Sequence, residues 1–182
     1  MRKTLTALAA ALLAIGAAAL AGCSNAQQDG APDGNAADGK PTLTVAMELA
    51  YPPFETKDDA GNPAGIAVDF MQDFADQYGY DLVVENTAWD GLIPSLQTGK
   101  ADCVISSMTI TDERAEVVDF TDPYAMAQLA ILANAQSGVE SVDDLNQPNK
   151  LVAVKTGSTG DVYATKNLPE AQIVRLADES AC

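Results

Sequence analysis

In the first part of the expected folded region, short runs of apolar residues alternate with segments in which apolar residues recur at helical spacing. Three runs have the length of buried strands: residues 42–47, 81–86 and 102–107. Between the first two runs, apolar side chains recur at four-residue steps and end at a glycine. These residues are Ile66, Phe70, Phe74 and Tyr78, followed by Gly79. This spacing predicts a helix with one apolar face.

Two shorter helices are predicted next to the strands. In residues 89–100, Leu92 and Leu96 lie one turn apart, and Pro94 is compatible with a helix only in its first turn. Residues 112–118 form a second candidate helix with Thr111 or Asp112 as its N-cap. The order strand, helix, strand, helix, strand with short connections predicts a parallel α/β layer.

A second α/β unit is predicted from about residue 133 onward. Residues 128–134 read as an apolar strand before it, and a loop with a short helix follows. Residues 150–167 then read as strand, glycine-rich turn and helix, and 171–176 as one more strand. This second unit contains two clear strands, and we find no internal repeat.

The N-terminus has the pattern of an export signal. Arg2 and Lys3 precede an apolar segment over residues 5–20. A membrane-spanning helix is the alternative, but the run is shorter than the roughly 20 residues that a span needs. The segment ends in Leu-Ala-Gly-Cys23, which resembles the lipobox of bacterial lipoproteins. That resemblance implies a signal peptide over 1–22, acylation of Cys23, and export to the outer face of the cell membrane.

The next segment is expected to be a tether. Residues 24–40 contain no large apolar side chain and are rich in Gly, Ala, Asn and Asp. A flexible chain of this length reaches about 20–25 Å from end to end. We therefore interpret residues 23–40 as a lipid-anchored linker.

Charge and composition exclude several functions. The chain of 182 residues has 10 Lys+Arg, 26 Asp+Glu and no His, for a net charge of −16. Such acidity repels phosphate backbones, so we expect no nucleic-acid partner. Without histidine the commonest metal ligand is missing, and we expect no metal and no cofactor. Cys103 fits a buried hydrophobe, and a disulfide between Cys103 and Cys182 is possible but not required by their spacing.

Polar and aromatic residues follow the ends of the three predicted strands. In open α/β sheets, ligands bind at the carboxyl ends of the strands. An acid, aromatic rings, hydroxyls and an arginine meeting there are typical of a pocket for a small polar ligand. The candidate residues are Glu48, Tyr51, Trp89, Ser106, Ser107, Thr109 and Arg114.

Four motifs in this order resemble one known family. They are "AYPPF" (50–54), "WDGLIPSLQTGKAD" (89–102), "ISSMTITDERAEVVDFTDPY" (105–124) and "VAVKTGSTG" (152–160). The family is that of the bacterial extracellular solute-binding proteins for polar amino acids, which serve ABC importers. The resemblance implies a two-lobe, Venus-flytrap α/β fold of the periplasmic-binding-protein type II. Lobe 1 would be residues 41–132, nearly complete, and lobe 2 residues 133–182, incomplete.

The resemblance also implies roles for the candidate residues. Arg114 would bind the α-carboxylate of a free amino acid bidentately, which lysine cannot do. Ser107 and Thr109, in the hydroxyl row that begins at Ser106, would add hydrogen bonds, and Thr159 would reach the carboxylate from the second lobe. Tyr51 and Trp89 would enclose the ligand side chain, and Glu48 would favour a cationic or amide-bearing one.

Each role has a structural alternative. Arg114 can pair on the surface with Asp112 or Glu116, and Trp89 can belong to the core. Glu48 can be a solvated charge, and Thr159 a hydroxyl of the helix cap. Tyr124 is expected to pack near the hinge, and Lys155 is assigned no role.

The resemblance favours a non-enzymatic, monomeric binding protein that delivers an amino acid to permease subunits. The alternative is a periplasmic cyclohexadienyl dehydratase acting on prephenate or arogenate, with Glu48 as its catalytic acid. The lipid anchor argues against that alternative. The second unit is shorter than the family's second lobe and has no match to its ligand-binding aspartate, since Asp178 falls too early. We therefore expect loose packing after about residue 135 and weak binding by this chain.

Overall fold

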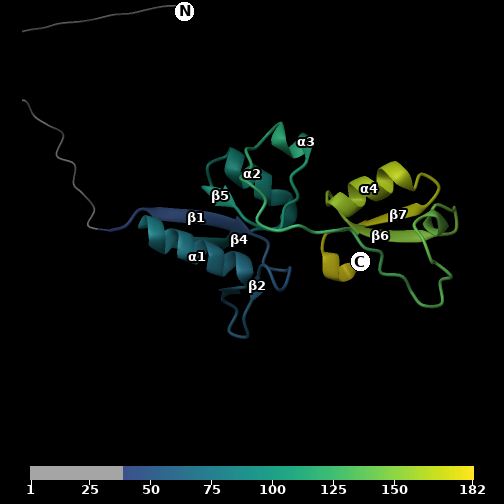
Figure 1. The fold of residues 1–182 in the computed structure, drawn as a ribbon, viewed down its shortest axis with the longest axis horizontal. Helices are drawn as coiled ribbons and strands as arrows, with labels where there is room; N and C mark the ends of the chain where they lie inside the picture. The colour runs from purple at the N-terminus through teal and green to yellow at the C-terminus, as the bar shows by residue number, and fades with distance from the viewer. Residues whose placement is uncertain (1–38) are drawn as a thin grey trace, which may run out of the picture. The chain divides into compact units, whose positions relative to one another are not determined.

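A computed structural model describes residues 39–182. A three-stranded parallel sheet in the order β4-β1-β5 carries the first part of this region (Figure 1). Its strands are β1 (Thr42–Met47), β4 (Asp81–Asn86) and β5 (Cys103–Val104). The parallel register pairs Thr42 with Asp81 and Val45 with Cys103, which confirms the predicted parallel layer. The third strand is shorter than the predicted run 102–107.

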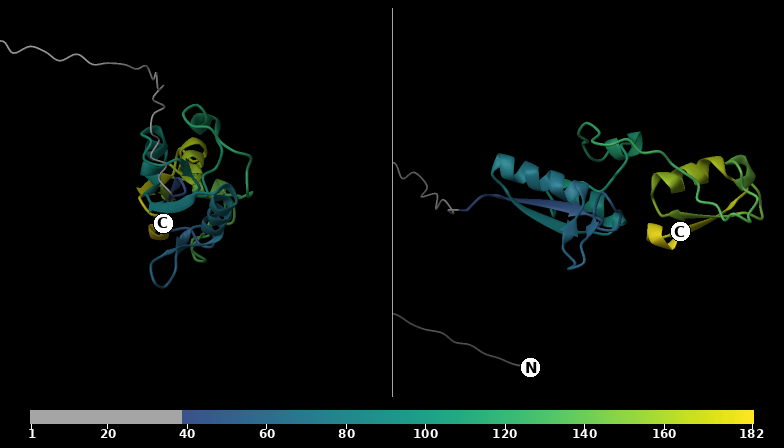
Figure 2. Two further views of the ribbon diagram at one scale, coloured as in Figure 1. Left: turned by 90° about the vertical axis from the view of Figure 1, so that its left-hand side faces the viewer. Right: turned by 60° about the horizontal axis from the view of Figure 1, so that its bottom comes forward.

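Helix α1 (Ile66–Tyr78) lies along one face of this sheet (Figure 2). It follows a small hairpin of β2 (Thr56–Lys57) and β3 (Pro63–Ala64). Gly65 precedes the helix with φ 117°, and a Cβ there would come within 2.5 Å of the carbonyl oxygen of Phe54. The helix ends at Gly79 in the left-handed conformation, as its position after the last apolar residue predicts.

The face of α1 that packs on the sheet is not the predicted apolar face. The residues at four-residue steps are 39–60% exposed: Ile66, Phe70, Phe74 and Tyr78. The buried residues of the helix are Ala67, Met71 and Ala75, one position later along the chain. Because two of these three are alanines, the helix backbone can approach the strands closely. The predicted helix and its apolar face are therefore correct, and the residues that pack on the sheet form a neighbouring face of smaller side chains.

Successive residues of β1 supply the cores on both faces of the sheet, as the twofold alternation of a strand requires. Val45 and Met47 contribute to the cluster that contains Ala67 and Met71 of α1. Ala46, between them, packs on the other face in a cluster with buried Leu92 and Ala101. All three β1 residues are at most 1% exposed.

The segments beyond the sheet form short helices close to their predicted places. Trp89–Gly91 is the 3-10 turn η1, and α2 (Leu92–Gln97) follows with Pro94 in its first turn. Helix α3 (Asp112–Ala115) is capped by Thr111, whose hydroxyl accepts a hydrogen bond from the Arg114 N–H.

The last part of the chain forms a second, two-stranded parallel sheet. Strands β6 (Leu151–Lys155) and β7 (Gln172–Leu176) pair directly, and α4 (Thr159–Asn167) connects them. Two further 3-10 turns are η2 (Asp143–Leu145) and η3 (Glu179–Ala181). Leu145, Val154, Ala164 and Leu168 form a small buried cluster. The expected looseness of this part stays a prediction.

The strand predicted at 128–134 does not form. Residues 125–134 carry no ladder in the described region, and Leu132 is fully exposed. The run has strand composition, but nothing among residues 39–182 pairs with it. The prediction of a strand there is wrong for this structure.

The predicted signal peptide (1–22), Cys23 and residues 24–38 of the linker lie outside the described residues. Among residues 39–182, none of the helices is both long and apolar enough to cross a membrane. Cys103 and Cys182 are both free thiols, so the possible disulfide between them is absent.

Candidate ligand-binding site

Glu48 stands at the carboxyl end of β1 and is held on three sides. Its N–H donates to the Ser106 hydroxyl at 2.9 Å, and its Oε1 accepts from the Trp89 N–H at 3.3 Å. Its Oε2 forms an ion pair with Lys155, and the two side chains are 13% and 7% exposed. Glu48 is therefore not a solvated strand-end charge but a mostly buried, paired carboxylate.

Trp89 presents its ring to two cations. The Lys155 Nζ lies 4.9 Å from the ring centroid, and the Arg114 Cζ lies 5.3 Å from it. Both distances are within the range of a cation–π interaction. The same side chain is half-buried against the cluster that contains Leu92. Trp89 thus packs on the core, as its structural alternative predicts, and its ring also faces two cations.

Arg114 is oriented by two backbone carbonyls. Its Nη1 donates to the Thr109 carbonyl at 2.7 Å and its Nη2 to the Gly157 carbonyl at 3.1 Å. Neither ion pair of the described region involves it, so it is not paired with Asp112 or Glu116. Burial lowers the pKa of the guanidinium, and Glu113 acts in the opposite direction. A guanidinium has five N–H donors, so further donors remain after these two bonds.

The hydroxyl row after β5 divides into different environments. Ser106 is buried and its hydroxyl is used by the Glu48 N–H, which makes it a structural contact. Ser107 has a left-handed backbone with φ 50°, and its N–H donates to the Tyr124 hydroxyl at 3.1 Å. The Ser107 hydroxyl is buried and has no partner among the described residues. Thr109 is exposed and contributes its carbonyl to Arg114.

The glycine-rich turn before α4 is rigidly supported. Ser158 caps the helix, because its hydroxyl accepts from the Asp161 N–H at 3.2 Å. The Gly157 N–H donates to Asp161 Oδ2 at 3.0 Å. Gly157 has φ 70° and its α-carbon faces the Trp89 indole nitrogen, 3.7 Å from where a Cβ would stand. Thr159 is the first residue of α4, directly after the cap residue, so it lies in the cap region as its structural alternative predicts, although Ser158 is the cap itself.

A row of aromatic rings lines the segment after β1. Tyr51 stacks on Phe54 with centroids 6.4 Å apart, and Phe54 meets the edge of Tyr124 at 6.5 Å. Tyr51 is 41% exposed, so one side of its ring is available. The structure places Tyr51 in this row, whereas the ring of Trp89 faces the two cations.

Glu55 is a functional candidate that the sequence reasoning missed. Its side chain is 1% exposed, and neither carboxylate oxygen has a hydrogen-bond partner among the described residues. Burial raises the pKa of Glu55 to about 7. Lys155, which the sequence left without a role, is likewise central, because it contacts both Glu48 and Trp89. The only sequence signal for Glu55 is its place directly after the "AYPPF" motif.

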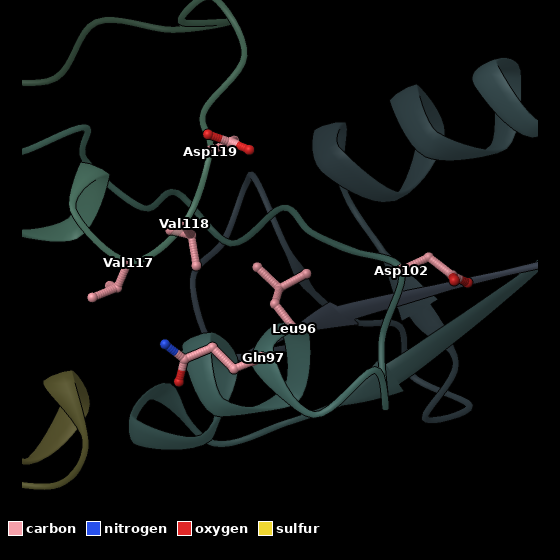
Figure 3. A pocket seen from close by; sticks show the side chains of 6 residues that line it. All are labelled: Leu96, Gln97, Asp102, Val117, Val118 and Asp119. Carbon is pink, nitrogen blue, oxygen red and sulfur yellow. The ribbon is translucent and has the colours of Figure 1, made fainter.

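The described residues offer no site for a metal ion, since no group of three or more His, Cys, Asp or Glu side chains converges there. A separate open hollow has a volume of about 300 Å³. Figure 3 shows the side chains that line it. Its lining residues are Leu96, Gln97, Asp102, Val117, Val118 and Asp119, and none of the candidate ligand residues is among them.

The chain is similar in sequence to amino-acid-binding proteins. A probable histidine-binding protein of Neisseria gonorrhoeae is 39% identical over 159 residues, which is 87% of this chain and 58% of the relative. The chain spans about half to three fifths of the length of the curated relatives it matches.

Solved structures agree with this likeness. The ancestral amino acid-binding protein AncCDT-1, a precursor of cyclohexadienyl dehydratase, is 40% identical with a TM-score of 0.71. The match covers 77% of this chain and 63% of that one. Structures of an ancestral arginine-binding protein bound to arginine and to glutamine each give 33% identity and a TM-score of 0.67, over 78% of this chain and 63% of that one.

These neighbours confirm the predicted fold class, a two-lobe α/β binding protein of which this chain contains a part. The model of the bacterial extracellular solute-binding proteins, family 3, matches residues 43–174. That match covers most of the chain and includes all four motifs singled out in the sequence. The chain belongs to the bacterial extracellular solute-binding proteins of family 3.

Proposed function

We propose that this protein is the substrate-binding component of an amino-acid ABC importer, which captures a free polar or cationic amino acid and delivers it to membrane permease subunits. The observation that carries the proposal is the cluster of Glu48, Trp89, Arg114 and Lys155 at the carboxyl ends of the strands. It combines an acid, an aromatic face and a preoriented guanidinium. A guanidinium suits the α-carboxylate of an amino acid, and an acid with an aromatic face suits a cationic or amide-bearing side chain.

Arg114 is the proposed anchor of the ligand α-carboxylate. Two carbonyls already fix the plane of its guanidinium, which reduces the entropy lost when a ligand binds. Ser107 and Thr109 are proposed to add hydrogen bonds beside it, and Thr159 from the start of α4. Ser106 acts indirectly, since its hydroxyl positions the Glu48 backbone.

Glu48 and Trp89 are proposed to select the ligand side chain, with Tyr51 as a second aromatic wall. In the structure an ammonium group, that of Lys155, already occupies a place against both the carboxylate and the ring. The contacts of Lys155 are those that a cationic ligand side chain would make. Relatives named for histidine and arginine binding, and a neighbour solved with glutamine, support a cationic or amide-bearing ligand.

The dehydratase alternative has less support. The neighbour related to that enzyme is itself an amino acid-binding protein. Glu48, the acid considered for catalysis, forms an ion pair with Lys155, so its carboxylate already has a partner within the protein. We therefore propose a binding protein and not an enzyme.

The N-terminal sequence extends this proposal to the location of the protein. A signal peptide over 1–22, a lipidated Cys23 and a linker to residue 40 would tether a monomeric binding domain at the outer face of the membrane. Lobe 1 over 41–132 and a partial lobe 2 over 133–182 remain the proposed domains.

Calorimetry with the twenty amino acids tests the proposal, since one or a few of them should bind. Arg114→Ala should weaken binding by roughly 30-fold or more, because a buried partner of a charge is lost. Arg114→Lys is the matched variant: it keeps the charge but loses the bidentate geometry, and should also bind weakly. Exposed Lys57→Ala is the control and should bind normally. Normal affinity in Arg114→Ala would refute the assigned role.

A further inference from the structure

Glu55 lies close enough to Ser107, Glu48 and Lys155 of the candidate site for each of them to influence its carboxyl group. Its backbone forms a tight bridge with Tyr51, in which the Tyr51 N–H donates to the Glu55 carbonyl at 2.7 Å and the Glu55 N–H donates back at 3.1 Å. The bridge holds the side chain inside the protein, where 1% of the residue is exposed. A carboxyl group placed there by the main chain has little freedom to turn toward water.

The carboxyl group and the Ser107 hydroxyl are a matched pair of unsatisfied groups. Both oxygens of Glu55 and the Oγ of Ser107 are buried without a hydrogen-bond partner in the described region. The hydroxyl lies close enough to lower the pKa of Glu55, although it does not reach hydrogen-bond geometry. Buried polar groups are nearly always paired, so this pair indicates a missing interaction.

Two charged side chains face Glu55 from different strands. Glu48, at the end of β1, disfavours ionisation of Glu55, and Lys155, at the end of β6, favours it. These two also form an ion pair with one another, so their effects on Glu55 oppose each other. Burial is the largest influence, and together these effects raise the pKa of Glu55 to about 7.

We propose that Glu55 is a positioning residue of the ligand site, which acts as a protonated acid on the Ser107 hydroxyl and thereby couples amino-acid binding to the uptake of one proton. This inference rests on the proposed function. It assigns a role to a residue that does not itself contact the ligand.

The coupling follows from the direction of one hydrogen bond. A protonated Glu55 can donate to the Ser107 Oγ, which leaves the hydroxyl hydrogen of Ser107 free to point at a ligand carboxylate. An ionised Glu55 accepts that hydrogen instead, and the Ser107 lone pairs then face the ligand. Lone pairs repel a carboxylate. The binding-competent form is therefore the protonated one, and its proton comes from solvent.

The expected effect on affinity can be calculated from the protonated fraction. If only the protonated form binds, the apparent Kd equals the intrinsic Kd divided by that fraction. With half-protonation near pH 7, the apparent Kd should rise about tenfold between about pH 6 and about pH 8. The chain has no histidine, which removes the usual source of such a change in this range.

Calorimetry of the full chain with L-arginine and L-glutamine across this pH range is the test. Glu55→Gln keeps a donor for Ser107 and cannot ionise, so it should bind nearly as well as the protonated wild type with a flat pH profile. Exposed Glu85→Gln is the matched control and should keep the wild-type profile. Glu55→Leu removes the donor and should bind weakly at every pH.

The outcomes separate this proposal from the proposed function. If wild type binds an amino acid with a Kd that does not change with pH, or if Glu55→Gln keeps the wild-type dependence of Kd on pH, the role of Glu55 is refuted while the proposed function stands. If no amino acid binds at any pH, both proposals fail together. A purely structural role predicts loss of affinity in Glu55→Gln without loss of the pH slope, and that result would also refute the coupling.

Discussion

The buried carboxyl of Glu55 should leave a measurable signature in stability even without a ligand. Its pKa rises from the ordinary value of 4.5 to about 7 in the folded protein, chiefly because of burial. Between these two values the folded protein holds a proton that the unfolded chain has released. The contribution of Glu55 to the free energy of unfolding is therefore fully present below about pH 4.5 and is lost as the pH rises to about 7.

The size of this effect follows from the two pKa values. Their difference, 7 − 4.5, at 1.36 kcal/mol for each pKa unit gives about 3 kcal/mol. Because Glu55 is 1% exposed, solvent screening reduces the figure little. A change of this size is a large part of the total, because the free energy of unfolding of a native protein is only about 5–15 kcal/mol.

Urea denaturation at a series of pH values measures the effect. Wild type should lose about 3 kcal/mol of unfolding free energy between about pH 4.5 and about pH 7 relative to Glu55→Gln. Asp161 does not interfere in this window. Burial raises the pKa of Asp161, but hydrogen bonds from Gly157 and Thr165 and the charge of Arg175 lower it overall. The contribution of Asp161 to stability is therefore lost only as the pH falls below about 3.8.

Equal pH slopes in wild type and Glu55→Gln would refute the reasoning, because Glu55 would then ionise in the folded state as freely as in the unfolded chain. Glu85→Gln serves as the control for the removal of one acid from the surface. Its slope should match the wild type. If Glu55→Gln were much less stable than wild type at every pH, the site would not accept a neutral side chain of the same shape. That result would contradict a neutral carboxyl group at Glu55.

Two further predictions concern the ligand charge and the anchor. Lys155→Met leaves Glu48 without its ion-pair partner, so the affinity for L-arginine should rise relative to L-glutamine, by roughly tenfold for an interaction of about 1.4 kcal/mol. Competition calorimetry measures the ratio, and an unchanged ratio would show that Lys155 does not compete with the ligand side chain. Cys23→Ala should release the protein from the membrane fraction into the soluble extracytoplasmic fraction. Cell fractionation measures this, and an unchanged membrane-bound fraction would contradict lipidation at Cys23.

Local sequence pattern alone determined two strands of the first sheet and the start of the helix that carries Arg114. The runs at 42–47 and 81–86 become β1 and β4 with the predicted bounds. Thr111 caps the helix of Arg114 as its hydroxyl and position predict. The apolar period and the cap depend on residues a few positions apart, so both can be recognised within one segment of the sequence.

Only the tertiary structure decided which residues are buried, paired or left without a neighbour. Residues 128–134 have the composition of a strand, but a strand needs a partner from elsewhere in the chain. The small residues of α1 face the sheet because alanine permits close approach, while the period alone favours the larger ones. Lys155 meets Glu48 across a separation of 107 positions. In the sequence, Glu55 cannot be distinguished from other acidic residues that follow a turn. Its raised pKa comes from burial in the folded protein, and burial is not visible in the residue type.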